Sequence, residues 1–543
     1  MTEQNNTRFQ IRLPIILAVT LAVGMFIGQQ LPHFDKQIRL APAYQPGGVA
    51  SSIDEILRYI ESRYVDTIKV NDLKTGAIDH LLEQLDPHSV YISPDELAAI
   101  EDEMSGDFEG IGIEFMMLDD TIQVVTPLSG GPSEAAGVLA GDRIVTINDS
   151  VVAGVKIDNG SIFKKLRGEK GSKVNLGILR GREKKLRKYT ITRDVIPVKS
   201  VDVAYMLDDR TAYVRITRFS ARTYQEFMEA VRPLSEEKSM QDLVLDLRGN
   251  PGGYLEEATD LLSQFFPEGK LLVYTKGRFE GRNEYKSNGR ARFPIRNIAV
   301  LIDEGSASAS EIVAGAVQDW DRGWVIGRRS FGKGLVQEQY PLSDGGALRL
   351  TVARYFTPSG RCIQRDYKND DDYDHDADRR LKNGELSDAS MIKLADSTKY
   401  YTGMGRVVFG GGGIIPDVFI PIDTSYTSDY YFEIRQMIPP FASRWIENDT
   451  HIPLPKTLDA FLHSYQISDE MLEALVKHAA DQGVPRNAAD LSDCRAELKL
   501  QLKARIAKML FGDEGLYAVF NDDDPAIDKA LKVLRSGEPV ARK

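Results

Sequence analysis

The spacing of apolar residues changes several times along the chain, and each change predicts a different kind of structure. Between residues 51 and 104, apolar positions recur every three or four residues, as in helices that bury one face. Residues 106–193 instead carry short alternating runs split by glycine turns, which are typical of strands, with a helical segment at 133–138. We therefore expect a small helical module followed by a β-rich domain.

The second half of the chain changes pattern again. From Val201 to about Phe419, apolar β-rich runs alternate with helical spacing at 224–234, 255–265 and 308–319, which predicts an α/β domain. Beyond residue 425, apolar stripes predict a mainly helical tail. The predicted boundaries are 1–34 for an export segment, 35–104 for the helical module, 105–194 for the β-rich domain, 195–424 for the α/β core and 425–543 for the helical C-terminal domain.

The first thirty residues carry an export pattern. Arg8 and Arg12 precede the uncharged apolar run Leu13–Gly28, which is slightly shorter than the about 17–25 residues of a spanning helix. The small-residue site Ala41-Pro42-Ala43 lies far downstream for signal cleavage. We therefore favour an uncleaved membrane anchor over a cleaved signal peptide, with the rest of the chain outside the cytoplasm.

Composition narrows the range of partners. The 68 basic and 80 acidic side chains give a net charge of −12, so we exclude nucleic acid, which needs a basic face. Cys362 and Cys494 form no CxxC pair, which argues against a zinc site. We expect two buried free thiols, with one disulfide in an oxidising compartment as the alternative. The acidic stretch at 369–378 lacks the glycine and final glutamate of a calcium loop, so we expect a solvated surface insertion and no metal.

The segment Gly305–Glu311 carries a candidate nucleophile. It follows an apolar strand and opens a helix, so Ser308 would present its hydroxyl near free backbone N–H groups of the helix. However, Ser308 and Glu311 also fit a capping box, in which both side chains only satisfy the first turn of the helix. On this segment alone, capping is the simpler interpretation.

A lysine lies in the second candidate segment, Gly327–Gly334. This segment nearly matches a phosphate-binding loop, but Gly334 offers no hydroxyl, and the residues after it have a strand pattern. Ser330 and Lys333 match the SxxK spacing, which needs a helix to bring the side chains together. Lys333 could instead act as a general base if burial lowers its pKa, or it could be a solvated turn lysine.

A conventional Ser-His-Asp relay is disfavoured. No histidine lies between residues 89 and 374, where the α/β core is predicted. In the glycine-rich turn Gly249–Gly253, Pro251 occupies the place where a serine nucleophile would stand.

Together, these segments resemble the carboxyl-terminal processing peptidases, or tail-specific proteases, over about residues 50 to 420. The family's motifs occur in the expected order: LDPHSVY at 85–91, a PDZ-like domain, DLRGNPGG at 246–253, GSASASE at 305–311, FGKGLVQ at 331–337, YFTPSGRCIQ at 355–364 and GGGGIIPD at 410–417. The resemblance implies an α/β (α+β) core of the crotonase-like or ClpP-type fold. It also implies an inserted PDZ-like domain, with the N-terminal helical module before it and the helical extension after the core.

The resemblance also implies roles for single residues. Ser308 would be the nucleophile, Lys333 its general base, and Gln337 the residue that orients the lysine. The implied oxyanion donors are the backbone N–H groups of Ala309 and of the turn at Gly252 or Gly253. No cofactor or metal takes part.

The β-rich domain would select substrates by their C-terminal ends. The implied carboxylate-binding loop is Gly110-Ile111-Gly112-Ile113, of which one isoleucine is expected to be ordinary core. The implied partners are protein or peptide substrates with apolar tails, a homodimer partner, an adaptor lipoprotein and, through the N-terminal segment, the periplasmic side of a bacterial inner membrane. A peptide-binding scaffold with an inactive protease fold is the alternative, and the retention of both Ser308 and Lys333 argues against it.

Overall fold

The computed structural model describes residues 52–118, 120–128, 130–139, 141–181, 183, 185–367, 373, 375–394, 396–448 and 454–536. The chain divides into two units, residues 1–76 and 77–543. The predicted export run Leu13–Gly28 lies outside the described residues. Among the helices of the described part, none is long and apolar enough to cross a membrane.

Helices form the N-terminal module, as predicted. They are α2 (Ser52–Arg63), α3 (Val70–Glu83) and α4 (Pro94–Ser105). Before α4, Ser93 donates its backbone N–H and its hydroxyl to Glu96 at 3.1 and 2.7 Å. Gly106, at φ 79°, follows the last turn of α4.

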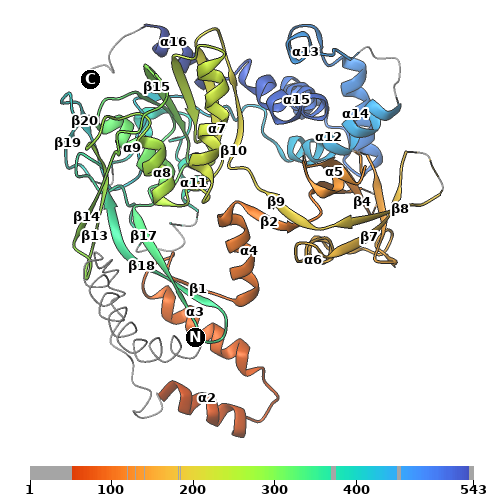
Figure 1. Ribbon diagram of the computed structural model, residues 1–543, viewed down its shortest axis with the longest axis horizontal. Helices are drawn as coiled ribbons and strands as arrows, with labels where there is room; N and C mark the ends of the chain where they lie inside the picture. The colour runs from red at the N-terminus through yellow and green to blue at the C-terminus, as the bar shows by residue number, and fades with distance from the viewer. Residues whose placement is uncertain are drawn as a thin grey trace, which may run out of the picture. The chain divides into compact units, whose positions relative to one another are not determined.

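A six-stranded sheet forms the core of the second unit. Its order is β10-β11-β12-β15-β16-β21, with β10 antiparallel to β11 and the other pairs parallel. Helices α7, α8 and α9 lie side by side against one face of this sheet (Figure 1). The bounds are β10 Val201–Met206, β11 Thr211–Ile216, α7 Thr223–Glu236, β12 Asp242–Asp246, α8 Leu255–Leu262, β15 Asn297–Ile302, α9 Ala309–Asp319, β16 Trp324–Gly327 and β21 Val418–Phe419. The predicted α/β domain is confirmed.

The second face of the core sheet is covered by the end of the chain. Apolar residues of α16 (Pro525–Ser536), among them Ile527 and Leu534, pack against Val244 and Ile326 of the sheet. The core is therefore a three-layer arrangement, and its last layer comes from the helical tail.

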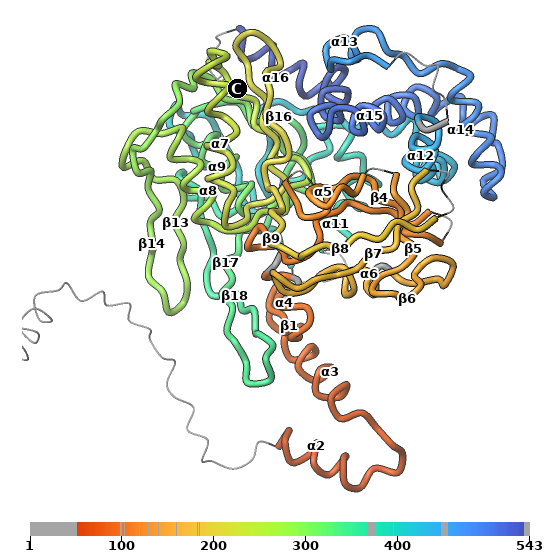
Figure 2. Tube along the Cα trace, turned by 45° about the vertical axis from the view of Figure 1, so that its right-hand side comes forward, coloured from red at the N-terminus to blue at the C-terminus, as the bar shows by residue number. Residues whose placement is uncertain are grey.

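An antiparallel sheet extends from the core as long hairpins, which Figure 2 shows. Its path is β1-β18-β13-β14, and β17 also pairs with β18. The bounds are β1 Val90–Ile92, β13 Leu271–Gly277, β14 Arg282–Lys286, β17 Leu335–Pro341 and β18 Ala347–Phe356. Smaller elements between this sheet and β21 are α11 Asp376–Lys382, η1 Ala389–Met391, β19 Tyr400–Tyr401 and β20 Val407–Val408.

The β-rich domain is a separate sheet with two short helices. Its order is β3-β4-β5-β7-β8, with β6 paired to β5, so β3 is an edge strand. The ribbon of β2 and β9 lies at the start and the end of this domain. The bounds are β2 Asp107–Gly110, β3 Ile113–Leu118, β4 Thr121–Pro127, α5 Pro132–Ala135, β5 Arg143–Ile147, β6 Ser150–Val151, α6 Asn159–Leu166, β7 Lys173–Leu179, β8 Arg187–Thr192 and β9 Asp194–Pro197.

The tail is helical, as predicted, and has its own apolar core. Before α16 it contains α12 (Asp429–Asn448), α13 (Leu458–Ser464), α14 (Asp469–Asp481) and α15 (Ala488–Asn521). At Gly512, with φ 68° and ψ −156°, α15 turns a corner between two helical halves.

The prediction of a solvated insertion at 369–378 is wrong for two of its residues. Tyr373 and Asp376 are each only 3% exposed. Asp376 forms ion pairs with Arg365 and Arg380, both of which are themselves buried. These arginines compensate the acidic charge, which is why a charge-dense stretch can enter the interior.

Candidate active site

The serine predicted as nucleophile stands at the N-terminus of α9. The two neighbouring serines are buried and bonded to the backbone: Ser306 donates its hydroxyl to Leu247 O at 2.8 Å and Ser310 to Asn250 O at 3.0 Å. Ser308 is half-buried, and its backbone lies at φ 53°, ψ −113°. A positive φ at a non-glycine residue is strained, and such strain is frequent at reactive positions. Of the three serines, Ser308 is therefore the one available for chemistry.

Glu311 joins the serine turn to the lysine loop. Its side chain is fully buried and accepts four hydrogen bonds. The donors are the Ser308 and Lys333 backbone N–H groups at 2.9 Å each, the Gly332 N–H at 2.7 Å and the Ser330 hydroxyl at 2.5 Å. Burial raises the pKa of Glu311 to about 7, against the opposing effect of these donors. The capping interpretation is thus correct for Glu311, and the same carboxylate also fixes the lysine loop.

Lys333 lies half-buried in the loop between β16 and β17. Burial lowers the pKa of its ammonium group, and the charge of Arg349 lowers it further, whereas Glu311 and Asp86 raise it. A lowered pKa increases the neutral fraction of the amine, which a general base requires. The flanking glycines leave no room for side chains: a Cβ on Gly334 would lie 2.9 Å from the backbone nitrogen of Gln364.

Gln337 follows on β17, and the amide nitrogen of its side chain is buried. This nitrogen has no hydrogen-bond partner among the described residues. A buried amide N–H group without an acceptor lowers the stability of the folded protein. The predicted role of Gln337 in orienting Lys333 stays a prediction.

The glycine turn before α8 lies directly against the serine. A Cβ on Gly252 would stand 2.6 Å from the Ser308 Cβ and 2.8 Å from the Ala309 nitrogen, so only glycine fits there. The Gly252 N–H already donates to Asn250 Oδ1 at 2.8 Å, whereas the Gly253 N–H shows no acceptor among the described residues. Ala309 is the first residue of α9, where helical N–H groups lack intrahelical acceptors. The turn and the helix start thus converge, and Gly253 is the better donor candidate in the turn.

The loop at 86–89, which carried no predicted role, lies near Lys333. Asp86 organises this loop by accepting the backbone N–H groups of His88 and Ser89 and the Ser89 hydroxyl at 2.6–3.1 Å. It also accepts the Thr351 hydroxyl from β18 at 2.9 Å. Burial, followed by the positive charge of Lys333, lowers the pKa of His88 from 6.5 to about 4. His88 is therefore neutral at physiological pH.

His88 contacts Tyr373, which packs against Phe331 and Arg365. Its Nε2 lies 2.7 Å from the Tyr373 hydroxyl, and the Tyr373 ring meets the Phe331 ring edge-on at 5.7 Å between centroids. The Arg365 guanidinium lies 3.8 Å from the centre of the Phe331 ring and 3.9 Å from that of Tyr373. Sequence reasoning missed this cluster because the partners of His88 come from the acidic stretch and from the lysine loop.

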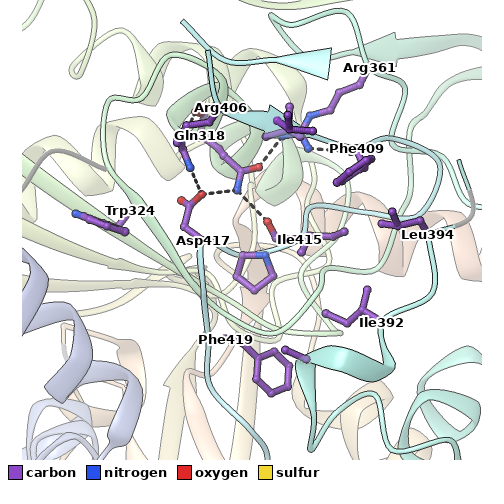
Figure 3. Close-up of a pocket in the computed structure, with 14 residues that line it drawn as sticks. Gln318, Trp324, Arg361, Ile392, Leu394, Arg406, Phe409, Ile415, Asp417 and Phe419 are labelled. Atoms are coloured by element: carbon purple, nitrogen blue, oxygen red, sulfur yellow. Dashed lines mark hydrogen bonds and ion pairs between the residues drawn. The ribbon is translucent and has the colours of Figure 1, made fainter. Parts of the chain in front are cut away.

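The motif at 355–364 contacts α9 at both of its ends. The Tyr355 hydroxyl donates to Ser308 O at 3.1 Å, while Arg361 binds Asp319 and Gln318 at 2.8 and 2.7 Å. A cavity of about 410 Å³ lies at the Gln318 end of the helix, at the opposite end from Ser308. There the Gln318 side-chain amide donates a hydrogen bond to Asp417 (Figure 3). This cavity is therefore separate from the site around Ser308.

The competing interpretations of the lysine loop are excluded by local geometry. Strand β17 follows the loop, where a phosphate-binding loop needs a helix. The Ser330 hydroxyl is buried and bound to Glu311, so it is not an SxxK nucleophile. The two cysteines are free, with Cys494 buried as predicted, but Cys362 is only half-buried.

The residues predicted to form the carboxylate-binding loop run from Gly110, the last residue of β2, to Ile113, the first residue of β3. Ile111 is 2% exposed and belongs to the core of the β domain, whereas Ile113 is half-buried at the start of the edge strand. Gly112 adopts φ 68°. Thus Ile111 is the core isoleucine, and a groove along β3 begins at Ile113.

The chain is similar to known proteases and to PDZ domains. The model of peptidase family S41 matches residues 210–373, a PDZ domain model matches 110–191, and a family of unknown function matches 434–512. A carboxy-terminal-processing protease of Bartonella bacilliformis is 38% identical over 321 residues, which cover 57% of this chain and 71% of the relative. CtpB, a carboxy-terminal processing protease of Bacillus subtilis, is 34% identical over 353 residues, covering 63% and 72%. The solved photosystem II D1 C-terminal processing protease is 31% identical with a TM-score of 0.33, covering 57% and 83%.

Proposed function

Because the chain belongs to the carboxy-terminal processing proteases of peptidase family S41 and carries a PDZ domain, we propose that it cleaves exported proteins selected by apolar C-terminal tails, with Ser308 as nucleophile and Lys333 as general base. The observation that carries the proposal is the shared acceptor Glu311. One buried carboxylate binds the backbone of both Ser308 and Lys333, which supports a role for both residues in one site.

The reaction is acyl transfer. Neutral Lys333 takes the proton of the Ser308 hydroxyl as the oxygen attacks a peptide carbonyl, and the C=O π bond opens to an oxyanion. The N–H groups of Ala309 and Gly253 stabilise this charge. When the intermediate collapses, the C–N bond breaks and the lysine ammonium protonates the leaving amine. Water then adds to the acyl ester and gives a proton to Lys333. The bond between the acyl carbon and Ser308 Oγ breaks, the lysine ammonium returns its proton to Oγ, and the product leaves as a carboxylic acid that ionises in water.

The β domain supports selection of substrates by their ends. Its edge strand β3 can pair with an extended peptide, and the loop Gly110–Ile113 can offer backbone N–H groups to a terminal carboxylate. This arrangement favours extended, C-terminal and apolar segments. It makes substrate binding and bond cleavage separate events on separate domains.

Labelling with a fluorophosphonate tests the nucleophile directly. We expect mass spectrometry to find the label on Ser308, and we expect Ser308→Ala and Lys333→Ala each to lose about 10³-fold or more in kcat on an unfolded substrate with an apolar tail. The exposed residues Ser464 and Lys477 provide matched controls, and their alanine variants should cleave normally. A label on another residue, or normal cleavage by Lys333→Ala, would refute the assignment.

We further propose that Leu13–Gly28 anchors the enzyme to the periplasmic face of a bacterial inner membrane, where its substrates are envelope proteins. A chain that starts after residue 34 should leave the membrane fraction under alkaline washing, whereas the full chain should stay. The homodimer and the adaptor lipoprotein remain predictions from the resemblance.

A further inference from the structure

A large groove runs along β3, the edge strand of the PDZ domain. The cavity measures about 760 Å³, and apolar side chains such as Ile113, Phe115 and Phe163 line it. Not all of its wall belongs to the PDZ domain. Gly512 and Asp513, at the corner of α15, line the same cavity.

An ion-pair cluster links α15 to the edge strand. Lys508 Nζ lies 3.4 Å from Glu114 Oε2 on β3 and 3.4 Å from Asp513 Oδ1. The Lys508 side chain is 23% exposed, but Glu114 is 38% and Asp513 is 51% exposed, so water screens both pairs. Arg505, one turn earlier on α15, faces the same carboxylate: burial lowers its pKa and the charge of Glu114 raises it. Two cations of the helical domain, Lys508 and Arg505, therefore attract the Glu114 carboxylate on β3.

The corner at Gly512 allows one helix to reach two domains. Its φ of 68° with ψ of −156° is essentially restricted to glycine. After the corner, α15 contacts the protease core: Tyr517 donates its hydroxyl to Asp202 at 2.9 Å, and Asn521 donates to the Tyr205 hydroxyl at 2.8 Å. Figures 1 and 2 both show α12 and α15 beside the PDZ strands. The corner thus lies where the groove meets β10 of the core.

We propose that the C-terminal helical domain, residues 429–536, completes the tail-binding groove, with the Gly512–Asp513 corner as its outer wall and the Lys508–Glu114 pair as the link that holds this wall against β3. The occupant is the apolar C-terminal tail of a protein substrate, so the inference rests on the proposed function. A family of unknown function matches residues 434–512 of this domain, which thereby becomes part of substrate selection.

The chemistry of the groove favours this occupant. A peptide that pairs with β3 has its backbone satisfied along one edge, and its side chains then need apolar contacts on both sides. The aromatic residues of the PDZ domain supply one side. The Lys508–Glu114 ion pair keeps the Gly512–Asp513 corner close to β3 without a covalent link. The groove therefore keeps an opening through which a chain end can enter.

The sharpest variant reverses one charge. Lys508→Glu places a third carboxylate beside Glu114 and Asp513, so the wall should separate from β3 by repulsion. Exchanging the pair, with Glu114→Lys and Lys508→Glu together, restores opposite charges across the same contact. Lys477→Glu, at an exposed position of α14, is the matched charge reversal away from the groove.

Binding is measured on the full chain with Ser308→Ala, by fluorescence anisotropy of a labelled ten-residue peptide that ends in four apolar residues with a free carboxylate. The same peptide with a C-terminal amide is the control ligand. We expect Lys508→Glu to weaken binding about threefold to fivefold and Lys477→Glu to bind normally. The exchange variant should recover only part of the loss, because Arg505 then faces a lysine and Asp513 a glutamate.

Two results would distinguish a failure of the composite groove from a failure of tail recognition by the PDZ domain. Equal affinity with and without Lys508→Glu, or no recovery in the exchange variant, would overturn the composite groove while tail recognition by the PDZ domain stands. If the Ser308→Ala chain binds the free-carboxylate and amide peptides equally, tail recognition itself fails, and the role of the helical domain in it fails too.

Discussion

Oε2 of Glu311 lies 2.9 Å from the backbone nitrogen of Lys333, although the two residues belong to different segments of the core. The same oxygen lies 2.9 Å from the backbone nitrogen of Ser308. One atom therefore sets the distance between the serine turn and the lysine loop. Changes at Glu311 should affect catalysis even though its side chain is fully buried.

Glu311→Gln tests this positioning. The amide replaces one carboxylate oxygen by a donor, so at least one buried N–H or O–H loses its acceptor. We expect a loss of about 2–4 kcal/mol in the free energy of unfolding and a fall in kcat of about tenfold to a hundredfold. Denaturant unfolding and steady-state kinetics measure the two effects. Glu338→Gln, at an exposed position on β17, should change stability by less than about 0.5 kcal/mol and leave kcat unaltered.

Two buried groups give opposite pH dependences of stability. The pKa of Glu311 is raised from 4.5 to about 7, so between these values the folded protein keeps a proton that the unfolded chain has lost, and stability falls as pH rises. The pKa of His88 is lowered from 6.5 to about 4, so in that window the unfolded chain holds the extra proton, and stability rises with pH.

The two slopes oppose each other between about pH 4.5 and 6.5. Relative to the wild type, the unfolding free energy of Glu311→Gln should therefore rise more steeply with pH in this window. That of His88→Asn should rise less or fall. Urea unfolding at half-unit pH steps measures the slopes, and identical slopes in all three proteins would contradict the assignment.

Arg349 should tune the pH dependence of cleavage. After burial, its charge is the next cause that lowers the pKa of Lys333. Arg349→Gln therefore raises this pKa, and the rise of kcat/KM with pH should move to higher pH. Arg354→Gln removes a cation from an exposed position of the same strand and should leave the profile in place. A profile unchanged by Arg349→Gln would show that Lys333 is not the titrating base.

The glycine turn offers a matched pair of substitutions. Gly252→Ala places a methyl group 2.6 Å from the Ser308 Cβ, which displaces the serine or the turn. We expect kcat to fall about a hundredfold or more, because the oxyanion donors lose their positions. Gly249→Ala, also at positive φ but with no atom within 4 Å of the new Cβ, should cost only about 1–2 kcal/mol of stability. Equal effects on kcat would contradict the close approach of Gly252 to Ser308.

Local pattern was sufficient to predict much of this fold. The strand before Ser308 and the strand after Lys333 have apolar spacing that depends only on neighbours in the chain, and both occur. His88 was not assigned to the site, because its approach to Lys333 depends on the pairing of distant strands. Nor could an amphipathic stripe reveal that α16 covers the core sheet, since such a stripe specifies an apolar face and not its partner.

The acidic stretch shows a second limit. Its composition predicts solvation, and the buried position of Asp376 depends on Arg365 and Arg380, whose side chains approach only in the folded chain. Charge along a sequence gives no information on such compensation. At this position the interior contains the ion pairs of Asp376 with Arg365 and Arg380 in place of apolar side chains.

Asp524 forms an ion pair with Arg248, with 2.7 Å between Arg248 Nη1 and Asp524 Oδ2. Arg248 immediately precedes the glycine turn that lies against Ser308, yet its partner is translated 276 residues later. At about 5–20 residues per second, the roughly 190 residues from Lys333 to Asp524 take about 10–40 s to make. A nascent chain thus contains Ser308 and Lys333 well before Arg248 gains its ion pair with Asp524.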